Sequence, residues 1–212
     1  MIIKSIDETS YQGMFKVCQE SGNPFFIRQD YLKTIMIENI SSGQNFNEHE
    51  DNELLDAALS CIVELKAVEY LARSEQSRFG LYQKLINKKY QKVYIENALD
   101  FLEKKNYLSD ERFSRAWIHS RMLNHCEGRT KLVNELISRG ISREISKNAV
   151  EEFFSENDEE ALCKKACEKF LKKGKNGEKL TAALLNSGFS YKMIKSINES
   201  RQVSFPVHPK AC

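Results

Sequence analysis

The sequence predicts a mostly α-helical protein in which three tandem three-helix repeats form an elongated stack, preceded by a small β-containing N-terminal extension. Apolar residues recur at helical spacing from residue 51 onward, and one helical pattern occurs three times along the chain. The first thirty residues differ, because they are rich in β-favouring residues and turn-forming residues.

The N-terminal extension is expected to form a small antiparallel sheet. Its apolar residues cluster at 2–6, 14–19 and 25–27, and the turn-forming sequence Ser-Gly-Asn-Pro precedes the last of these. Asp30 is expected to cap a short helix that continues to Ile40, and the polar stretch that follows is expected to be a linker. The extension and its linker therefore occupy 1–50, with a domain boundary near residue 50.

Three helical units follow this boundary. They span 51–105, 107–155 and 157–200, and a flexible tail is expected at 201–212. In the first unit, apolar residues three and four positions apart predict helices at 51–74, 76–88 and 91–105.

The second unit contains the clearest helical hairpin. Ser109 is a good N-cap, and Asp110 and Glu111 place negative charge in the first turn, where the helix dipole favours it. The helix breaks before Gly128, and a second helix with an apolar stripe ends at Gly140, a residue that tolerates the left-handed conformation. The hairpin has basic outer faces.

The three units are related by repetition. Shifting the sequence by 51 residues, and then by a further 48, superposes equivalent positions of the three units. One such position holds Arg78, Arg129 and Gly177, and another holds Leu81, Leu132 and Leu180. Because repeated units of this kind complete one another's cores, the recurring leucines are expected to be packing residues.

Charge is unevenly distributed along the chain. The net charge of +2 from 32 basic and 30 acidic residues does not indicate nucleic-acid binding by itself. Basic residues nevertheless gather in the first two units, and residues 73–92 hold six of them against one acid. We expect a partner-binding surface formed by Arg73, Arg78, Lys84, Lys88, Lys89, Arg115, Arg121, Arg129, Lys131 and Arg139.

Two alternatives apply to these residues. Any single lysine can simply be part of a solvated face. Arg78 and Arg129 precede core leucines by three positions, so they can instead hold adjacent helices together. Trp117 also has two interpretations, because it is either an anchor of the apolar core or a stacking platform for a base or a partner side chain.

The residues give little support for an enzyme, a metal centre or a membrane protein. The chain has no phosphate-binding loop, no His-Glu-x-x-His motif and no nucleophile elbow, so neither catalysis nor a cofactor is expected. The six cysteines are expected to be reduced thiols, and Cys163 and Cys167 have no second pair of ligands at zinc-binding spacing. No apolar run reaches the ~20 residues of a membrane span, and a cytoplasmic protein is expected.

Three segments resemble the successive signatures of the bacterial RecX family. They are AVEYLARSEQSRFGLYQKLINKKY (67–90), YLSDERFSRAWIHSR (107–121) and GRTKLVNELISRGI (128–141). The resemblance covers about 51–200, and the N-terminal extension is similar to that of longer family members. It implies three tandem three-helix repeats, no enzymatic activity, and binding to the RecA recombinase. The third unit departs from the pattern at Gly177, where the other units have arginine.

The resemblance implies a regulator of RecA in DNA repair and homologous recombination, including the SOS response. Such a protein, expected to be a monomer, binds along the RecA–single-stranded DNA filament and usually inhibits filament assembly, ATP hydrolysis and strand exchange, with direct DNA contact secondary. Two alternatives remain at this point: a helical DNA- or RNA-binding protein without a recombinase partner, and an adaptor for an acidic partner. An effect that depends on the recombinase and is absent on naked DNA distinguishes the first function from the other two.

Overall fold

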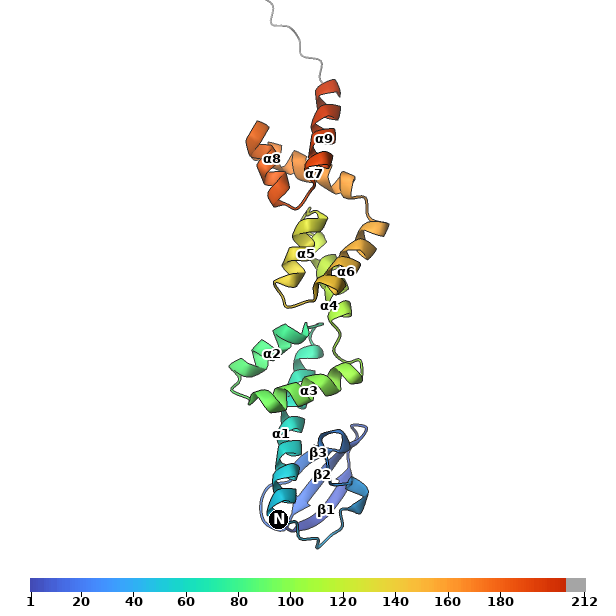
Figure 1. The fold of residues 1–212 in the computed structure, drawn as a ribbon, viewed down its shortest axis with the longest axis vertical. Helices are drawn as coiled ribbons and strands as arrows, with labels where there is room; N and C mark the ends of the chain where they lie inside the picture. Colours follow the sequence, from blue (N-terminus) through green and yellow to red (C-terminus); the bar gives the residue numbers. More distant parts are fainter. Residues whose placement is uncertain (205–212) are drawn as a thin grey trace, which may run out of the picture. The chain divides into compact units, whose positions relative to one another are not determined.

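The computed structural model describes residues 1–204, including the side chains of residues 1–200. Helices dominate, and a small antiparallel sheet lies near the N-terminus, which confirms the predicted mostly α-helical class with a β-containing N-terminal extension (Figure 1). The chain forms two compact units, of which the first comprises Met1–Ser109 and the second begins at Asp110.

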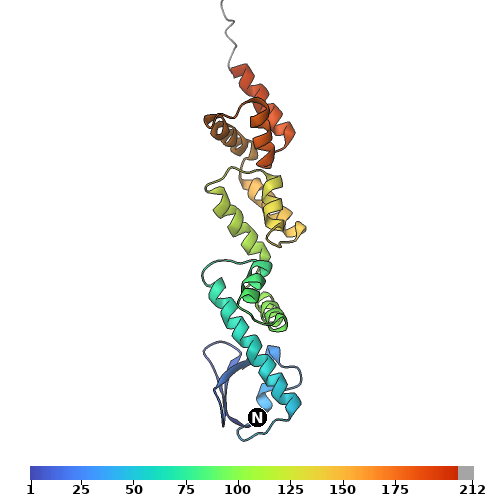
Figure 2. The same cartoon turned by 90° about the vertical axis from the view of Figure 1, so that its left-hand side faces the viewer.

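The sheet consists of β1 (Ile3–Glu8), β2 (Met14–Gln19) and β3 (Phe25–Arg28), in that order and antiparallel. Alternation places the side chains of Ile3, Val17 and Ile27 on one face, where all three are fully buried. This face packs against α1 (Glu48–Leu71), the long helix that runs along the sheet in Figure 2. The predicted N-terminal sheet is therefore confirmed.

The short helix expected from Asp30 to Ile40 is not present. In its place are two 3-10 turns, η1 (Gln29–Tyr31) and η2 (Ile37–Asn39). The carboxylate of Glu53 in α1 accepts hydrogen bonds from the backbone N–H groups of residues 33–35, at 2.5, 2.7 and 3.2 Å. These groups are thereby engaged by a distant side chain rather than by the carbonyls of a helix.

Helix α1 begins before the expected residue 51. Asn47 accepts hydrogen bonds from the backbone N–H groups of His49 and Glu50, while the Glu50 side chain accepts from the backbone of Asn47, which completes a capping box. Phe46, in the stretch expected to be a linker, is buried, and its N–H donates to the carbonyl of Met1. The sheet and α1 share one core, so the strands join the first bundle and are not separated from it near residue 50.

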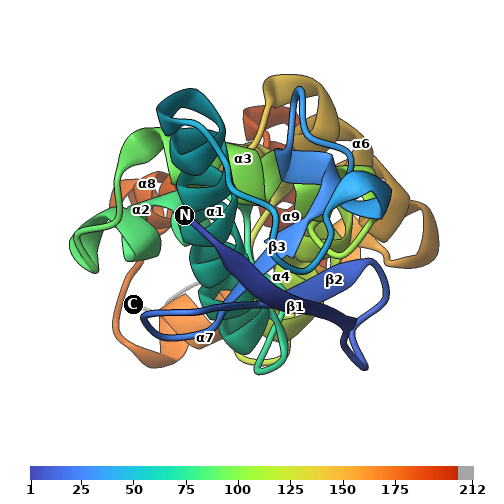
Figure 3. The same ribbon diagram turned by 90° about the horizontal axis from the view of Figure 1, so that it is seen from below.

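The first bundle combines the C-terminal half of α1 with α2 (Arg78–Asn87) and α3 (Lys92–Lys104). Its core contains the fully buried Leu81, Leu85, Ile95 and Leu99. The view from the sheet end places α1 close to β3, with α3 beside it (Figure 3).

The second unit contains two further bundles. Their helices are α4 (Asp110–Met122), α5 (Arg129–Ile137), α6 (Arg143–Glu156), α7 (Glu159–Lys172), α8 (Gly177–Asn186) and α9 (Tyr191–Ser204). Leu132 and Leu180 are buried in separate cores, as Leu81 is in the first bundle, which confirms the packing role of this repeated position. Helix α9 continues past the expected start of the tail, and residues 205–212 lie outside the described part of the chain.

The repeats also share the way in which their second helix ends. The residues in left-handed conformation are Lys89, Gly140 and Gly188, with φ of 68°, 81° and 88°. After each, the next N–H donates to the carbonyl of a core leucine five positions earlier, at 3.4, 3.2 and 3.3 Å. Two repeats use glycine where the left-handed conformation costs little, whereas the first repeat has a lysine.

Candidate partner-binding surface

The ten basic residues proposed from the sequence fall into two groups. Six form ion pairs inside their own unit: Arg78, Arg115, Arg121, Arg129, Lys131 and Arg139. The other four, Arg73, Lys84, Lys88 and Lys89, pair with no acid in residues 1–200. The structure therefore does not give the ten residues equivalent surroundings.

The unpaired group lies where α1 ends and on α2. Lys84 lies in the last turn of α2, Lys88 is the C-cap of that helix, and Lys89 follows directly, so the three lysines gather at the C-terminal end of α2. The Lys84 ammonium donates to the amide oxygen of Gln76 at 2.6 Å and lies 5.3 Å from the centre of the Tyr70 ring. All of these lysines are exposed. Their charges are therefore available to an anionic partner without first breaking an ion pair.

Arg78, in contrast, is bound by acidic residues of its own bundle. Its guanidinium donates to three carboxylates on α3, those of Glu96, Asp100 and Glu103, at 2.5, 2.7 and 2.6 Å. These acids are four and three positions apart and so occupy one face of α3. Arg78 consequently holds the start of α2 against α3, as one of the two sequence-based interpretations expects.

Arg129 also bridges helices, but with a different partner. Its guanidinium donates to Glu159 in α7 at 2.9 Å, and its backbone N–H donates to the other oxygen of the same carboxylate at 3.2 Å. The guanidinium lies over the ring of Phe154, 4.6 Å from its centre. Arg129 therefore connects the second bundle to the first helix of the third bundle.

A buried carboxylate organises the turn between α4 and α5. Glu127 is only 4% exposed, and it accepts hydrogen bonds from the Arg121 guanidinium at 2.9 and 3.0 Å. Lys131 lies 2.8 Å from the same carboxylate. Burial alone raises the pKa of Glu127, but the hydrogen bonds from Arg121 and Lys131 outweigh burial and lower it.

Trp117 lies at the edge of the second core. Its ring is half-buried and packs against that core, while the Arg139 guanidinium covers it at 4.5 Å and Arg121 lies 5.8 Å away. Arg139 is itself paired with Glu135 at 2.7 Å. This position agrees with the core-anchor interpretation, and a stacking base would first have to displace Arg139.

Sequence reasoning missed one polar cluster in the first unit. Arg28 of β3 donates twice to Glu64 of α1, at 2.7 Å each, and both side chains are buried. The hydroxyl of Tyr31 donates to the same carboxylate at 2.9 Å, and the Arg28 guanidinium lies 4.6 Å from the centre of the Phe101 ring. The four residues come from four separate elements, β3, η1, α1 and α3, so no spacing in the sequence points to the cluster.

The cysteines found in the third core behave as packing residues. Cys163 and Cys167 are buried on α7, and burial raises the pKa of Cys163 to about 12. Among residues 1–204, no group of three or more His, Cys, Asp or Glu side chains is arranged to hold a metal ion. Nor does that part of the chain contain a helix long and apolar enough to span a membrane.

Sequence comparison links the chain to one family. A family model described as the second three-helix domain of RecX matches residues 109–150. A regulatory protein RecX from Treponema pallidum is 35% identical over 132 residues, covering 62% of this chain and 80% of that protein. A regulatory protein RecX from Streptococcus sanguinis is 26% identical over 191 residues, covering 87% of this chain and 71% of that protein.

Solved structures show a similar fold. The crystal structure of a regulatory protein RecX superposes with a TM-score of 0.75, covering 93% of this chain and 98% of that one at 17% identity. The structure of RecX from Lactobacillus salivarius covers 68% of this chain and 97% of that one, with a TM-score of 0.59 and 18% identity. At such low identity these likenesses concern the fold alone.

Proposed function

Because this chain belongs to the RecX family, we propose that it regulates a RecA recombinase by binding along the filament that RecA forms on single-stranded DNA. In this role it limits filament assembly, ATP hydrolysis and strand exchange. The relatives are named as regulatory proteins, a name that indicates no catalytic activity. The proposal places the protein in the cytoplasm, as a monomer that acts without a cofactor.

The observation that carries this proposal is the set of unpaired cations at the end of α1 and on α2. A RecA–DNA filament presents a repeating anionic surface, and a cation that forms no ion pair within the protein can meet an anion without first breaking one. Arg73, Lys84, Lys88 and Lys89 have this property in the described part of the chain. We propose that they form the main contact with the filament.

The six paired basic residues have a different role in this proposal. Arg78, Arg129 and Arg121 hold helices or a turn in place through carboxylates of the same unit. Arg78 supports the filament-binding surface indirectly, because it holds α2 against α3, whereas Arg121 and Arg129 stabilise the second unit. Several weak contacts to successive subunits of the filament then add up through multivalency.

The decisive test is DNA-dependent ATP hydrolysis by RecA from the matching organism, titrated with this protein at moderate salt. We expect substoichiometric protein to lower both the rate of hydrolysis and the filament length seen by electron microscopy. Binding to naked single-stranded DNA is measured in parallel. Unchanged hydrolysis and filament length at equimolar protein, together with tight binding to naked DNA, would refute the recombinase-regulator proposal.

A second candidate is a nucleic-acid-binding protein without a recombinase partner. The same exposed lysines of α2 favour it, because they suit contacts with phosphates. Four phosphate contacts predict that the affinity for single-stranded DNA falls with salt, with a log–log slope of about −3. An inhibition of RecA that depends much less on salt than DNA binding does would favour the first candidate.

A further inference from the structure

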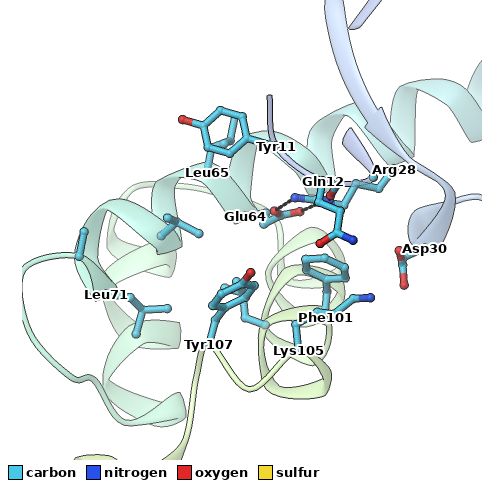
Figure 4. Close-up of a pocket in the computed structure, with 14 residues that line it drawn as sticks. Tyr11, Gln12, Arg28, Asp30, Glu64, Leu65, Leu71, Phe101, Lys105 and Tyr107 are labelled. Carbon is cyan, nitrogen blue, oxygen red and sulfur yellow. Dashed lines mark hydrogen bonds and ion pairs between the residues drawn. The ribbon is translucent and has the colours of Figure 1, made fainter. Parts of the chain in front are cut away.

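A cavity of about 660 Å³ lies in the first unit, and its lining residues do not include the cations at the end of α2. The turn between β1 and β2, helix α1 and the end of α3 form its walls (Figure 4). Its volume lies in the range of pockets that hold a small ligand or a large side chain. The function proposed above makes no use of it.

One wall of the cavity is apolar and uncovered. Leu65, Val68 and Ala72 follow one another at helical spacing on α1, on a side that neither the sheet nor α2 covers completely. Val68 is 38% exposed. Tyr11 and Tyr107 are 59% and 63% exposed, and Figure 4 shows their rings on opposite sides of the opening. Two tyrosines and an aliphatic wall thus border one opening.

The floor is polar, but its charges are already satisfied. Arg28 donates to Glu64 and to the carbonyl of Gln12, the latter at 2.5 Å, so each of its three nitrogens has a partner. Asp30, also at the cavity, lies 3.4 Å from the ammonium of Lys104. The floor of the cavity is therefore a fixed polar surface, and its charged groups already have partners within the protein.

Lys105 supplies the uncompensated charge of the rim. It is exposed, it forms no ion pair with any acid in residues 1–200, and its ammonium lies 5.7 Å from the centre of the Phe101 ring. An occupant that fits an apolar wall and also brings a carboxylate to Lys105 is complementary to the site in both shape and charge.

We propose that this cavity binds an acidic segment of a protein partner, which inserts an apolar side chain between Tyr11 and Tyr107 and presents a carboxylate to Lys105. The exposure of the rim favours a side chain carried on a polypeptide over a small metabolite, which proteins usually enclose on most sides. Tyrosine is also among the residues that contribute most to protein interfaces. The proposal is independent of the function proposed above.

The test is a selection from a displayed library of random twelve-residue peptides on the full chain. We expect enrichment of peptides that combine an aromatic or aliphatic residue with aspartate or glutamate. The affinity of an enriched peptide should fall about two- to fivefold with Lys105→Ala, the usual effect of an exposed ion pair. It should fall at least about tenfold with Val68→Asp, which puts a charge into the apolar wall.

Two matched variants serve as controls. Lys33→Ala removes an exposed lysine of the same unit that does not line the cavity, and Val93→Asp changes a valine of α3 that is 54% exposed. Both should leave the affinity unchanged. The proposal would be overturned if the selected peptides were basic or uncharged. It would also be overturned if the wild type and Lys105→Ala bound them with equal affinity, or if the wild type gave no enrichment over the Val68→Asp variant.

Discussion

The first and second bundles use the same repeated arginine in different ways. Arg78 pairs with three acids on α3 of its own bundle, whereas Arg129 pairs with Glu159 in the bundle that follows. The third repeat has Gly177 at this position and so has no side chain to pair. The repeat thus determines the position of the arginine. The acidic residues near it are not part of the repeat, and they determine which helices the arginine connects.

The two compact units also differ in whether their proposed partner-binding cations form ion pairs. Each proposed cation of the second unit has a carboxylate partner, while the first unit leaves four of its five without one among the described residues. The position of a cation in the repeat therefore does not determine whether that cation is free of ion pairs. The difference between paired and unpaired cations makes predictions for stability and for binding.

The largest stability effect is expected at the buried ion pair of the first unit. Arg28→Leu leaves Glu64 buried without its cation and should lower the free energy of unfolding by about 3–5 kcal/mol. Arg129→Ala, which breaks a half-exposed pair in the second unit, should cost only about 1 kcal/mol. Urea unfolding of the two variants measures both values, and equal costs would contradict this contrast.

A smaller loss is expected where two turns meet in the second unit. A Cβ atom at Gly188 would lie 2.5 Å from the backbone nitrogen of Lys131, and Gly188 has a φ of +88°. Gly188→Ala should therefore destabilise the protein by about 3 kcal/mol, of which the left-handed conformation contributes about 1–2 kcal/mol. Gly174→Ala is the control, since that glycine has a φ of +76° but no atom nearby. Thermal melts that show the same loss for both variants would refute the steric explanation.

Acid should weaken the first unit through Glu53. Burial raises the pKa of this carboxyl, but hydrogen bonds from Thr34, Ile35 and Lys33 outweigh burial and lower it to about 2. Because the folded pKa lies below the unfolded value of about 4.3, the contribution is complete above pH ~4.3 and is lost as the pH falls toward 2. Glu53→Gln should cost about 2 kcal/mol at pH 7 and make unfolding less sensitive to acid in this range.

The control for Glu53 is Glu48→Gln, which changes an exposed acid in the first turn of α1. It should alter the free energy of unfolding by less than about 0.5 kcal/mol at any pH between 2 and 7. Urea unfolding at several pH values compares the two variants. If Glu53→Gln keeps the full acid sensitivity of the wild type, the role assigned to this carboxylate is wrong.

The smallest expected change is a gain in stability. Lys89 occupies the left-handed position that the other two repeats give to glycine, so Lys89→Gly should stabilise the first unit by about 1 kcal/mol. The same substitution removes one of the unpaired cations and should weaken filament binding. Thermal melts and binding to the RecA filament are measured side by side. If Lys89→Gly raises both the melting temperature and the affinity for the filament, the proposed role of Lys89 is wrong.

The periodicity of apolar residues in the sequence was sufficient to predict the helices and the repeated core positions. Leucines at equivalent positions, such as Leu81 and Leu132, lie on apolar stripes, and burial of such stripes follows from local spacing alone. The residues after Gln29 show where this reasoning fails. Their backbone donors are taken by Glu53, and the side chain of Gln29 accepts from Ile37, so a helix-like pattern folds into 3-10 turns.

The candidate surface was predictable only in part. Sequence indicates that basic residues gather in the first two repeats, but not which of them have acids as neighbours. The partner of Arg129 lies 30 residues away, and those of Arg78 lie 18 to 25 residues away. These distances along the chain carry no local signal, so only the folded structure separates the paired from the unpaired cations.

The most direct test of that separation compares two triple variants in the RecA ATP hydrolysis assay. One replaces the unpaired Lys84, Lys88 and Lys89 with alanine. The other removes the same charge from exposed cations that are paired, with the substitutions Arg115→Ala, Lys164→Ala and Lys195→Ala. We predict that the first raises the half-inhibiting concentration at least about tenfold, while the second changes it by less than about twofold. Equal effects of the two triple variants would contradict the claim that the unpaired cations of α2 bind the filament.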